Sequence, residues 1–238
     1  MLTISLITLG SPEQLTGGYL YHRRMADFAP AYDAALEFVS FPTRPFPLPA
    51  AAGNRVLRQA RRANVVVVDS LAAAFLAPWP LPHAVAAILH QPPGGIDNRA
   101  VRRGLQKRLD TTVYRRCQLL IFASRALVAD ASDRRTVVVP PGSDVSVVPA
   151  GPLPALRQGR QVAFLSVGNW IPRKGTLELL TAFARLPDNA ATLHLVGRTD
   201  QDRRYAARVR CRLAQPDLAD RVVVHGPVPP AEVARFYA

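Results

Sequence analysis

Four consecutive valines, Val65–Val68, constrain the fold of this 238-residue chain more than any other stretch. A strand that alternates apolar and polar residues can keep one face in water, whereas a continuous apolar run must be buried on both faces. The valines therefore predict a central parallel strand in an α/β fold, with Asp69 at its carboxyl end. Ligands of open α/β sheets gather at that end, although capping the next helix is the commoner role for such an aspartate.

Other short apolar runs, separated by helical patterns and turn residues, extend this sheet and predict a second one. Strands are expected near 4–9, 37–41, 65–68, 84–89, 119–123 and 137–139, and again near 162–167, 191–196 and 222–224. Apolar residues at helical spacing predict helices near 18–28, 54–62, 99–116, 176–184, 203–213 and 232–238. A stretch rich in proline and glycine divides the two series, so we expect domains at 1–150 and 161–238 and a linker at 151–160.

The composition narrows the classes of protein and of partner. Hydrophobic residues make up 49% of the chain, which is typical of a globular protein, and the formal net charge is +13. The basic residues are spread along the chain, and no recognition-helix, RNA-binding or finger motif accompanies them. This pattern favours anionic substrates or an anionic membrane surface, and we expect no nucleic acid partner.

The two cysteines, Cys117 and Cys211, are isolated from each other and from any histidine cluster. They support neither a zinc site nor a disulfide framework. Residues 1–10 lack the charged start and the cleavage site of a signal peptide, and three prolines interrupt the long apolar stretch 71–89. We therefore expect a cytoplasmic protein.

The clearest chemistry lies in the stretch 162–185, which has the order strand, glycine turn, basic loop and helix. The expected helix begins near Lys174 and Gly175. Unpaired N–H groups and the positive end of the helix dipole attract an anion at such a start, and Lys174 adds a full charge. Only Lys107 and Lys174 are lysines among the thirty basic residues. The stretch predicts a diphosphate site, and the alternative is a solvated basic loop.

The same stretch resembles the retaining glycosyltransferases of family 4 in two motifs. Residues 168–175 read GNWIPRKG, against the family's G-R-x-x-P-x-K-G, and residues 182–186 read AFARL, against A-F-x-x-L. Asn169 is a departure, because the family usually has an arginine there that holds the donor diphosphate. Arg173 or Arg198 is expected to substitute for it, or else the site is weaker.

The resemblance implies an α/β fold of the GT-B type, with two Rossmann-like parallel-sheet domains facing a cleft. It covers nearly all of this chain but only about the first two thirds of a typical member. The second domain is therefore expected to be incomplete, and two glutamates that contact the donor in the family fall outside the match. The sequence is thus expected to be truncated at its C-terminus, to need a partner chain, or to be a degenerate member.

Several residues become site candidates through the resemblance. Gly17 and Gly18, in the first strand-to-helix turn, are expected to lie against the donor phosphates and the acceptor. His90, after the strand 84–89, is expected to lie beside the donor sugar; the alternative is a histidine satisfied by backbone groups. The predicted donor site comprises Gly17, Gly18, Gly168, Asn169, Arg173, Lys174, Gly175, Gly197, Arg198 and Gly226, with His90 and Lys174 as catalytic groups.

The implied activity is transfer of a sugar from a nucleotide diphosphate sugar to an acceptor hydroxyl, with retained anomeric configuration and no metal or other cofactor. The acceptor can be a glycan, a lipid-linked molecule or a small molecule. The alternative is a catalytically incomplete subunit that only binds the nucleotide sugar. The basic amphipathic pattern of residues 99–116 is either an ordinary solvated face or a site of peripheral contact with anionic lipid.

Overall fold

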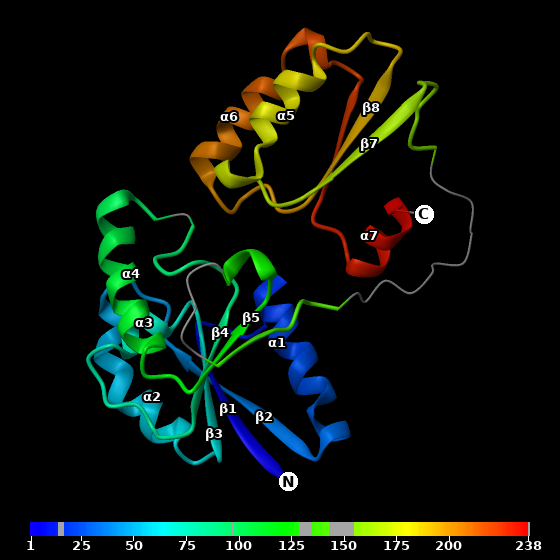
Figure 1. The fold of residues 1–238 in the computed structure, drawn as a ribbon. Coiled ribbons are helices and arrows are strands. Elements are labelled where there is room, and N and C mark those ends of the chain that lie inside the picture. Colours follow the sequence, from blue (N-terminus) through cyan, green and yellow to red (C-terminus); the bar gives the residue numbers. More distant parts are fainter. Residues whose placement is uncertain (14–16, 97, 129–134, 143–154, 238) are drawn as a thin grey trace. The chain divides into compact units, whose positions relative to one another are not determined.

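The chain forms two compact units, Met1–Gly142 and Ser143–Ala238, each built on its own parallel sheet (Figure 1). A computed structural model describes residues 1–13, 17–96, 98–128, 135–142 and 155–237. The predicted α/β fold class, with two parallel-sheet units, is confirmed.

The first unit contains a six-stranded sheet in the order β2-β1-β3-β4-β5-β6, with all neighbours parallel. The strands are β1 Leu2–Leu9, β2 Ala34–Phe41, β3 Val65–Asp69, β4 Val85–Leu89, β5 Leu119–Phe122 and β6 Thr136–Val138. The helices are α1 Gly17–Phe28, α2 Gly53–Ala60, α3 Ala73–Leu76 and α4 Ala100–Tyr114, and short 3-10 turns span Ala29–Tyr32, Leu48–Ala52 and Arg125–Leu127. The strand β2 begins three residues before the predicted 37–41, because all eight of its residues pair with β1.

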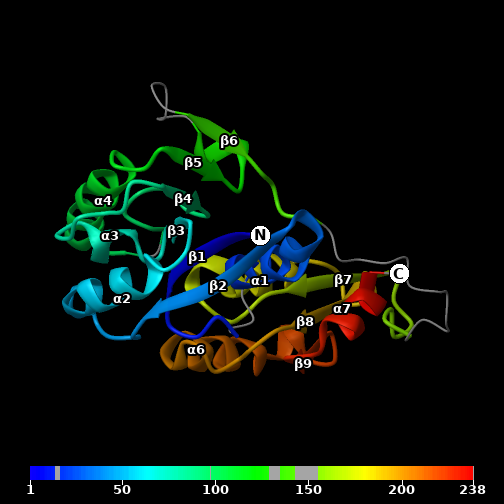
Figure 2. The ribbon, with the colours of Figure 1, turned by 90° about the horizontal axis from the view of Figure 1, so that it is seen from below.

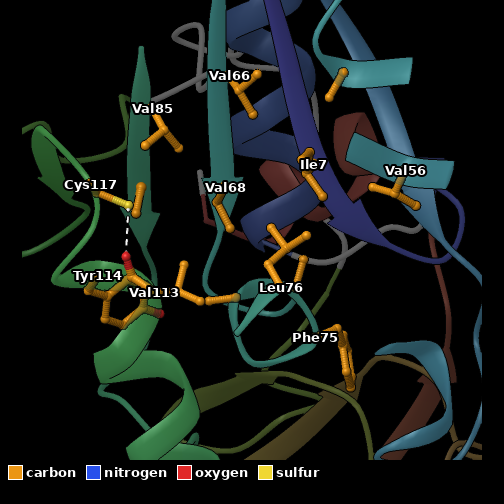
Figure 3. Close-up of a cluster of buried hydrophobic side chains, with 14 of the residues drawn as sticks. Ile7, Val56, Val66, Val68, Phe75, Leu76, Val85, Val113, Tyr114 and Cys117 are labelled. Carbon is orange, nitrogen blue, oxygen red and sulfur yellow. Dashed lines mark hydrogen bonds between the residues drawn. The ribbon is translucent and has the colours of Figure 1, made fainter. Parts of the chain in front are cut away.

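Helices cover both faces of this sheet, as the valine run requires. The helices α2, α3 and α4 lie on one face and α1 lies on the other (Figures 1 and 2). Val66 and Val68 of β3 belong to the core under α2, α3 and α4, with Ile7, Leu76 and Val113 (Figure 3). Val67 points the other way, into a smaller cluster that includes Tyr21 and Met25 of α1.

The helix α4 forms as predicted, but it does not bury the face that carries its apolar residues. Val101 is 89% exposed and Leu105 is 50% exposed, whereas the polar residues Gln106 and Asp110 are buried. The loop after β4 explains this orientation, because Gly94 N–H donates to Asp110 Oδ2 at 2.8 Å and Asn98 Nδ2 donates to Gln106 Oε1 at 3.0 Å. Polar contacts with the loop therefore set the face that α4 buries.

The second unit has a three-stranded parallel sheet in the order β7-β8-β9. The strands are β7 Val162–Val167, β8 Ala191–Val196 and β9 Val222–Gly226, and the helices are α5 Thr176–Phe183, α6 Arg203–Leu213 and α7 Pro230–Tyr237, with 3-10 turns at Pro172–Lys174 and Pro216–Leu218. Apolar residues of α5 and α6 pack with the central strand β8 in one core, which includes Leu180, Leu193 and Val209. Figure 1 shows both helices on the same face of the sheet.

The predicted linker lies partly outside the described residues, and so do residues 143 and 144 of the turn expected after β6. The described end of the linker is bound to β8: His194 Nε2 donates to Leu156 O at 2.7 Å, and Thr192 Oγ1 donates to Arg157 O at 2.8 Å. In the part of the chain that the structure describes, no helix combines the length and the apolar character needed to cross a bilayer.

Candidate functional site

The carboxyl ends of the parallel strands carry the candidate residues in both units. In the first unit, β1, β3 and β4 end at Leu9, Asp69 and Leu89, and His90 follows β4 directly. The register pairs Asp69 with Ile88 of the neighbouring strand, which brings Asp69 and His90 to the same edge of the sheet. His90 N–H donates to Ser70 Oγ at 3.3 Å, which holds the backbone of this edge together.

His90 is paired with a second histidine from the first helix. His22 of α1 is fully buried, and its Nε2 lies 2.9 Å from Nε2 of His90. The helix α1 presents Tyr19 and His22 on its buried side. Tyr21 packs edge to face on the His90 ring at 5.1 Å between ring centroids, and its hydroxyl donates to Val139 O at 3.0 Å.

Asp69 completes this cluster. Its Oδ2 accepts a hydrogen bond from Thr8 Oγ1 at 2.8 Å and lies 4.0 Å from Nδ1 of His22. Its Oδ1 accepts from Leu71 N at 3.1 Å and from Ser70 Oγ at 3.2 Å. The carboxylate therefore caps the turn after β3, close to the predicted capping role, and it also faces the buried histidine.

Burial favours the neutral forms of the two histidines and of the tyrosines beside them. Desolvation lowers the pKa of His22 to about 4 and also lowers the pKa of His90, and the Asp69 charge opposes both shifts. Burial raises the pKa values of Tyr19 and Tyr21. Each imidazole therefore carries a single ring proton, which can serve only one nitrogen at a time.

The same three side chains form a possible set of metal ligands, a set that sequence reasoning did not anticipate. One ligand atom from each of His22, Asp69 and His90 lies within 4.8 Å of the others. An ion bound through either Nε2 would displace the proton shared by the two histidines, because a metal and a hydrogen bond compete for one lone pair. Without an ion, the two Nε2 atoms form a hydrogen bond with each other.

The two predicted glycines of this unit differ in their surroundings. Gly18 lies against His90, since a β-carbon added to it would stand 3.7 Å from His90 Cδ2. Gly17 begins α1 and is exposed, and a β-carbon there would meet nothing within 4 Å. Gly18 and His90 thus lie together, whereas Gly17 borders open space.

In the second unit, three predicted glycines follow or end neighbouring strands. Gly168 N–H donates to Val196 O at 2.7 Å, and Gly197 N–H donates to Gly226 O at 2.8 Å. The hydrogen bonds continue the β7-β8-β9 ladder by one step and align the three loop starts side by side. Of the three glycines, Gly226 borders open space, whereas Gly197 packs on the Gly168 carbonyl and Gly168 packs on the Lys174 stem.

Lys174 lies at this edge of the second sheet. It ends the 3-10 turn Pro172–Lys174, and Gly175 follows with a φ of 65°, at the N-terminus of α5. The Lys174 stem lies over Gly168, where an added β-carbon would stand 3.4 Å from Cδ of the lysine. Lys174 is exposed and forms no ion pair with any residue in the described ranges. Its ammonium is therefore available to an anion.

Asn169, at the position where the resembled family has an arginine, forms two hydrogen bonds to the loop after β8. Its Oδ1 accepts from Arg198 N at 3.0 Å, and its Nδ2 donates to Gln201 Oε1 at 2.7 Å. The amide thereby ties the loop after β7 to the loop after β8. The Arg198 guanidinium forms two 3.1 Å contacts with Asp200, which lowers the pKa of that carboxyl. Arg173 is exposed beside Lys174.

Sequence reasoning missed His22, and it placed Asp69 at the ligand-binding end of the sheet with capping as its commoner role. One signal was present: His22 is three residues after Tyr19, so it falls on the buried stripe of α1, where a titratable group needs a polar partner. The partner itself could not be identified, because His90 is 68 residues away in the sequence.

No protein-family profile and no curated protein sequence matches the chain. Solved structures do resemble it. Anabaena Alr3699/HepE in complex with UDP-glucose has a TM-score of 0.69 at 18% identity, over 98% of this chain and 71% of HepE. The lipopolysaccharide outer core galactosyltransferase WaaB has a TM-score of 0.60 at 12% identity, over 98% and 71%. A glycosyltransferase from Rickettsia africae has a TM-score of 0.65 at 11% identity, over 99% and 70%. These likenesses show that the fold is of the GT-B type.

Proposed function

We propose that this protein transfers a sugar from a nucleotide diphosphate sugar to an acceptor hydroxyl, with retention of anomeric configuration. The observation that carries the proposal is the glycine-lined edge of the second sheet, where Lys174 lies over Gly168 and beside the start of α5. The likeness of the fold to HepE and WaaB also supports the proposal. As in the family that the sequence resembles, we assign this edge to the donor diphosphate.

Lys174 would stabilise the departing nucleotide diphosphate. As the bond between the sugar and the diphosphate breaks, negative charge grows on the leaving oxygen, and a cation already held at that place lowers the barrier. Part of the helix N-terminus is committed elsewhere, because Leu177 N–H donates to Tyr205 Oη at 3.1 Å. The lysine charge is therefore expected to contribute more than the α5 backbone.

Calorimetric titration with UDP, GDP and ADP tests the donor site. UDP is the first choice, because HepE has been solved with UDP and with UDP-glucose. Lys174→Ala is expected to weaken binding by at least about tenfold, since a charge-assisted contact to phosphate is worth roughly 1.5–3 kcal/mol. Lys107→Ala removes the chain's other lysine, which lies on α4 of the first unit, and should leave the affinity unchanged. Equal loss in both variants would point to nonspecific charge attraction.

The stereochemistry can be tested without knowing the acceptor. Slow hydrolysis of the donor releases a free sugar, and proton NMR shows which anomer forms before mutarotation. A retaining reaction releases first the anomer present in the donor, and release of the opposite anomer would contradict the proposal. Addition of EDTA is expected to leave the rate unchanged, because Lys174 supplies the positive charge that a metal would otherwise provide. Binding without any turnover would identify the chain as the binding-only subunit.

We also propose that the first unit contacts an anionic membrane surface through α4. Ile96, Val101 and Leu105 expose apolar surface, and the exposed basic residues Arg102, Arg103, Lys107 and Arg108 lie among them. Apolar side chains beside basic ones suit the headgroup region of an anionic bilayer. Co-sedimentation should be stronger with phosphatidylglycerol vesicles than with phosphatidylcholine vesicles, and Val101→Asp should weaken it. Equal sedimentation with both lipids would contradict this contact.

A further inference from the structure

The contact between His22 and His90 restricts both rings, because it joins two nitrogens of the same type. Their Nε2 atoms lie 2.9 Å apart, so one of them must carry the proton and the other must accept it. His22 is fully buried and His90 is half-buried, an environment that favours two neutral rings in this contact. If one ring carries its proton on Nε2, the other must carry its proton on Nδ1. The two tautomers are thus complementary.

Asp69 decides which ring donates. Its Oδ2 lies 4.0 Å from Nδ1 of His22, a distance too long for a good hydrogen bond but short for an electrostatic interaction in a buried site. His22 Nδ1 is buried and has no hydrogen-bond partner among the described residues. A proton on this nitrogen would face a carboxylate, whereas a lone pair there would face the carboxylate's own lone pairs. The field therefore favours His22 with its proton on Nδ1 and a lone pair on Nε2.

It follows that His90 donates through Nε2 and keeps a lone pair on Nδ1. His90 itself is only partly buried. Tyr21 packs on one side of the ring and Gly18 lies near Cδ2. The position of the ring is thus fixed by packing, while its tautomer is fixed through His22.

We infer that Asp69 and His22 are positioning residues, which hold His90 as the Nε2–H tautomer so that its Nδ1 accepts a hydrogen bond from a substrate hydroxyl. The inference rests on the proposed function for the identity of the substrate, a sugar or acceptor carrying that hydroxyl. A histidine of the opposite tautomer would offer an N–H there instead, and it would favour a carbonyl or phosphate oxygen. The cluster thereby selects the kind of group that His90 can bind.

Nitrogen-15 NMR of the full chain tests the tautomers directly. With histidine labelled and EDTA present, long-range proton–nitrogen correlations should show His90 protonated on Nε2 and His22 protonated on Nδ1 at pH 7.5. His90→Gln and His22→Gln assign the two signals among the five histidines of the chain. Asp69→Asn keeps an oxygen acceptor for Leu71 N and removes the charge, so it should shift both tautomer populations measurably. A wild-type His90 protonated on Nδ1 overturns the inference, as does an unchanged population in Asp69→Asn.

Kinetics separates a positioning role from a merely structural one. His22→Gln can still accept from His90 Nε2–H through its side-chain oxygen, whereas His22→Leu cannot. We expect His22→Leu to lower kcat at least about tenfold with little change in nucleotide affinity, and His22→Gln to recover most of the rate. The exposed His83→Gln is the matched control and should behave as wild type. Equal rates in the Leu and Gln variants, with both folded by circular dichroism, would contradict the inference.

The two proposals fail in different ways. If the NMR tautomers are as inferred but no nucleotide sugar is turned over, the proposed function is wrong and the assignment of His90 as a hydrogen-bond acceptor stands. If the sugar is transferred but His90 is protonated on Nδ1, the function stands and the inference is wrong. Displacement of the shared proton by stoichiometric Zn²⁺, with an increase in activity, would replace the tautomer assignment by a metal site.

Discussion

The backbone of Gly197 lies against the carbonyl group of Gly168, so closely that a β-carbon on Gly197 would stand 2.3 Å from that oxygen. Gly197 also has a φ of 141°, a conformation that other residues rarely adopt. The contact joins the loops after β7 and β8, the same two loops that Asn169 ties together. This edge of the second sheet therefore packs closely because position 197 carries no side chain.

This contact predicts that Gly197→Ala weakens both the fold and donor binding. The new methyl group must push Gly168 away, and the backbone strain adds about 1–3 kcal/mol. We expect nucleotide affinity to fall at least about tenfold in calorimetry. Gly159→Ala is the matched control, because Gly159 has a φ of 79° but open space around it and lies outside the proposed donor site. Its effect should be limited to backbone strain, and an equally large loss of affinity there would show that the Gly168 contact is unimportant.

The contacts of Arg221 lead to a second prediction, which concerns only the stability of the second unit. Its buried guanidinium donates to Leu186 O at 2.9 Å and Pro187 O at 3.2 Å, and lies 4.8 Å from the Phe183 ring. Arg221→Lys cannot reach these groups together, so we expect the second unit to lose on the order of 3 kcal/mol. Denaturation followed through Trp170, in a background in which Trp79 is replaced by phenylalanine, reports on this unit.

The control for Arg221 is its own acidic partner. Asp188 accepts from Arg221 at 3.1 Å but its side chain is 94% exposed. Asp188→Ala should therefore cost less than about 1 kcal/mol, as is usual for pairs that reach the surface. A larger loss in Asp188→Ala than in Arg221→Lys would mean that the ion pair, and not the carbonyl contacts, stabilises this corner.

Two buried groups of the first unit make opposite contributions to its pH dependence. Burial lowers the pKa of His22 from 6.5 to about 4. Between these pH values the unfolded chain binds a proton on His22 and the folded chain does not, so the free energy of unfolding falls as pH falls. Burial raises the pKa of Asp110 from 3.8 to about 6, so the folded chain keeps a proton that the unfolded chain releases, and stability rises as pH falls. The two effects nearly cancel between about pH 4 and 6.

Asp110→Asn is expected to remove the contribution of Asp110 and so to change how the stability of the first unit depends on pH. At pH 7.5 the variant should be more stable than wild type, by up to an order of 3 kcal/mol, because a buried charge is gone. The gain should vanish near pH 4, where wild-type Asp110 is protonated. Urea denaturation followed through Trp79 in a Trp170→Phe background measures it. The exposed Asp27→Asn should show no such trend, and a gain that is constant with pH would contradict the assigned titration.

Gly53 predicts a spectroscopic effect in the first unit. A β-carbon on Gly53 would lie 2.2 Å from Nε1 of Trp79, whose N–H donates to Ala50 O at 2.9 Å. Gly53→Ala should displace the indole, shift its emission to longer wavelength and cost about 1–3 kcal/mol. Gly104→Ala, in open space on α4, should leave the emission unchanged and raise stability slightly. An unshifted spectrum in Gly53→Ala would show that α2 moves instead of the tryptophan.

The sequence predicted most of the fold because apolar runs and glycine turns are local signals. The β3 valines gave a strand buried on both faces, and the 168–175 motif gave a strand, turn and helix that the structure confirms. The face buried by α4 was not predictable, because it depends on hydrogen bonds from Gly94 and Asn98 to polar residues of the helix. Similarly, Lys174 was evident from its motif, whereas the partnership of His22 with His90 needed the tertiary structure.

The many contacts of Asp69 limit how this protein can be re-engineered. One carboxylate accepts hydrogen bonds from Thr8 of β1 and from Leu71 in the turn after β3, and also faces His22. A substitution of Asp69 is therefore expected to change both the stability of the first unit and the tautomer inferred for His90. Directed evolution of this protein should accordingly leave position 69 as aspartate.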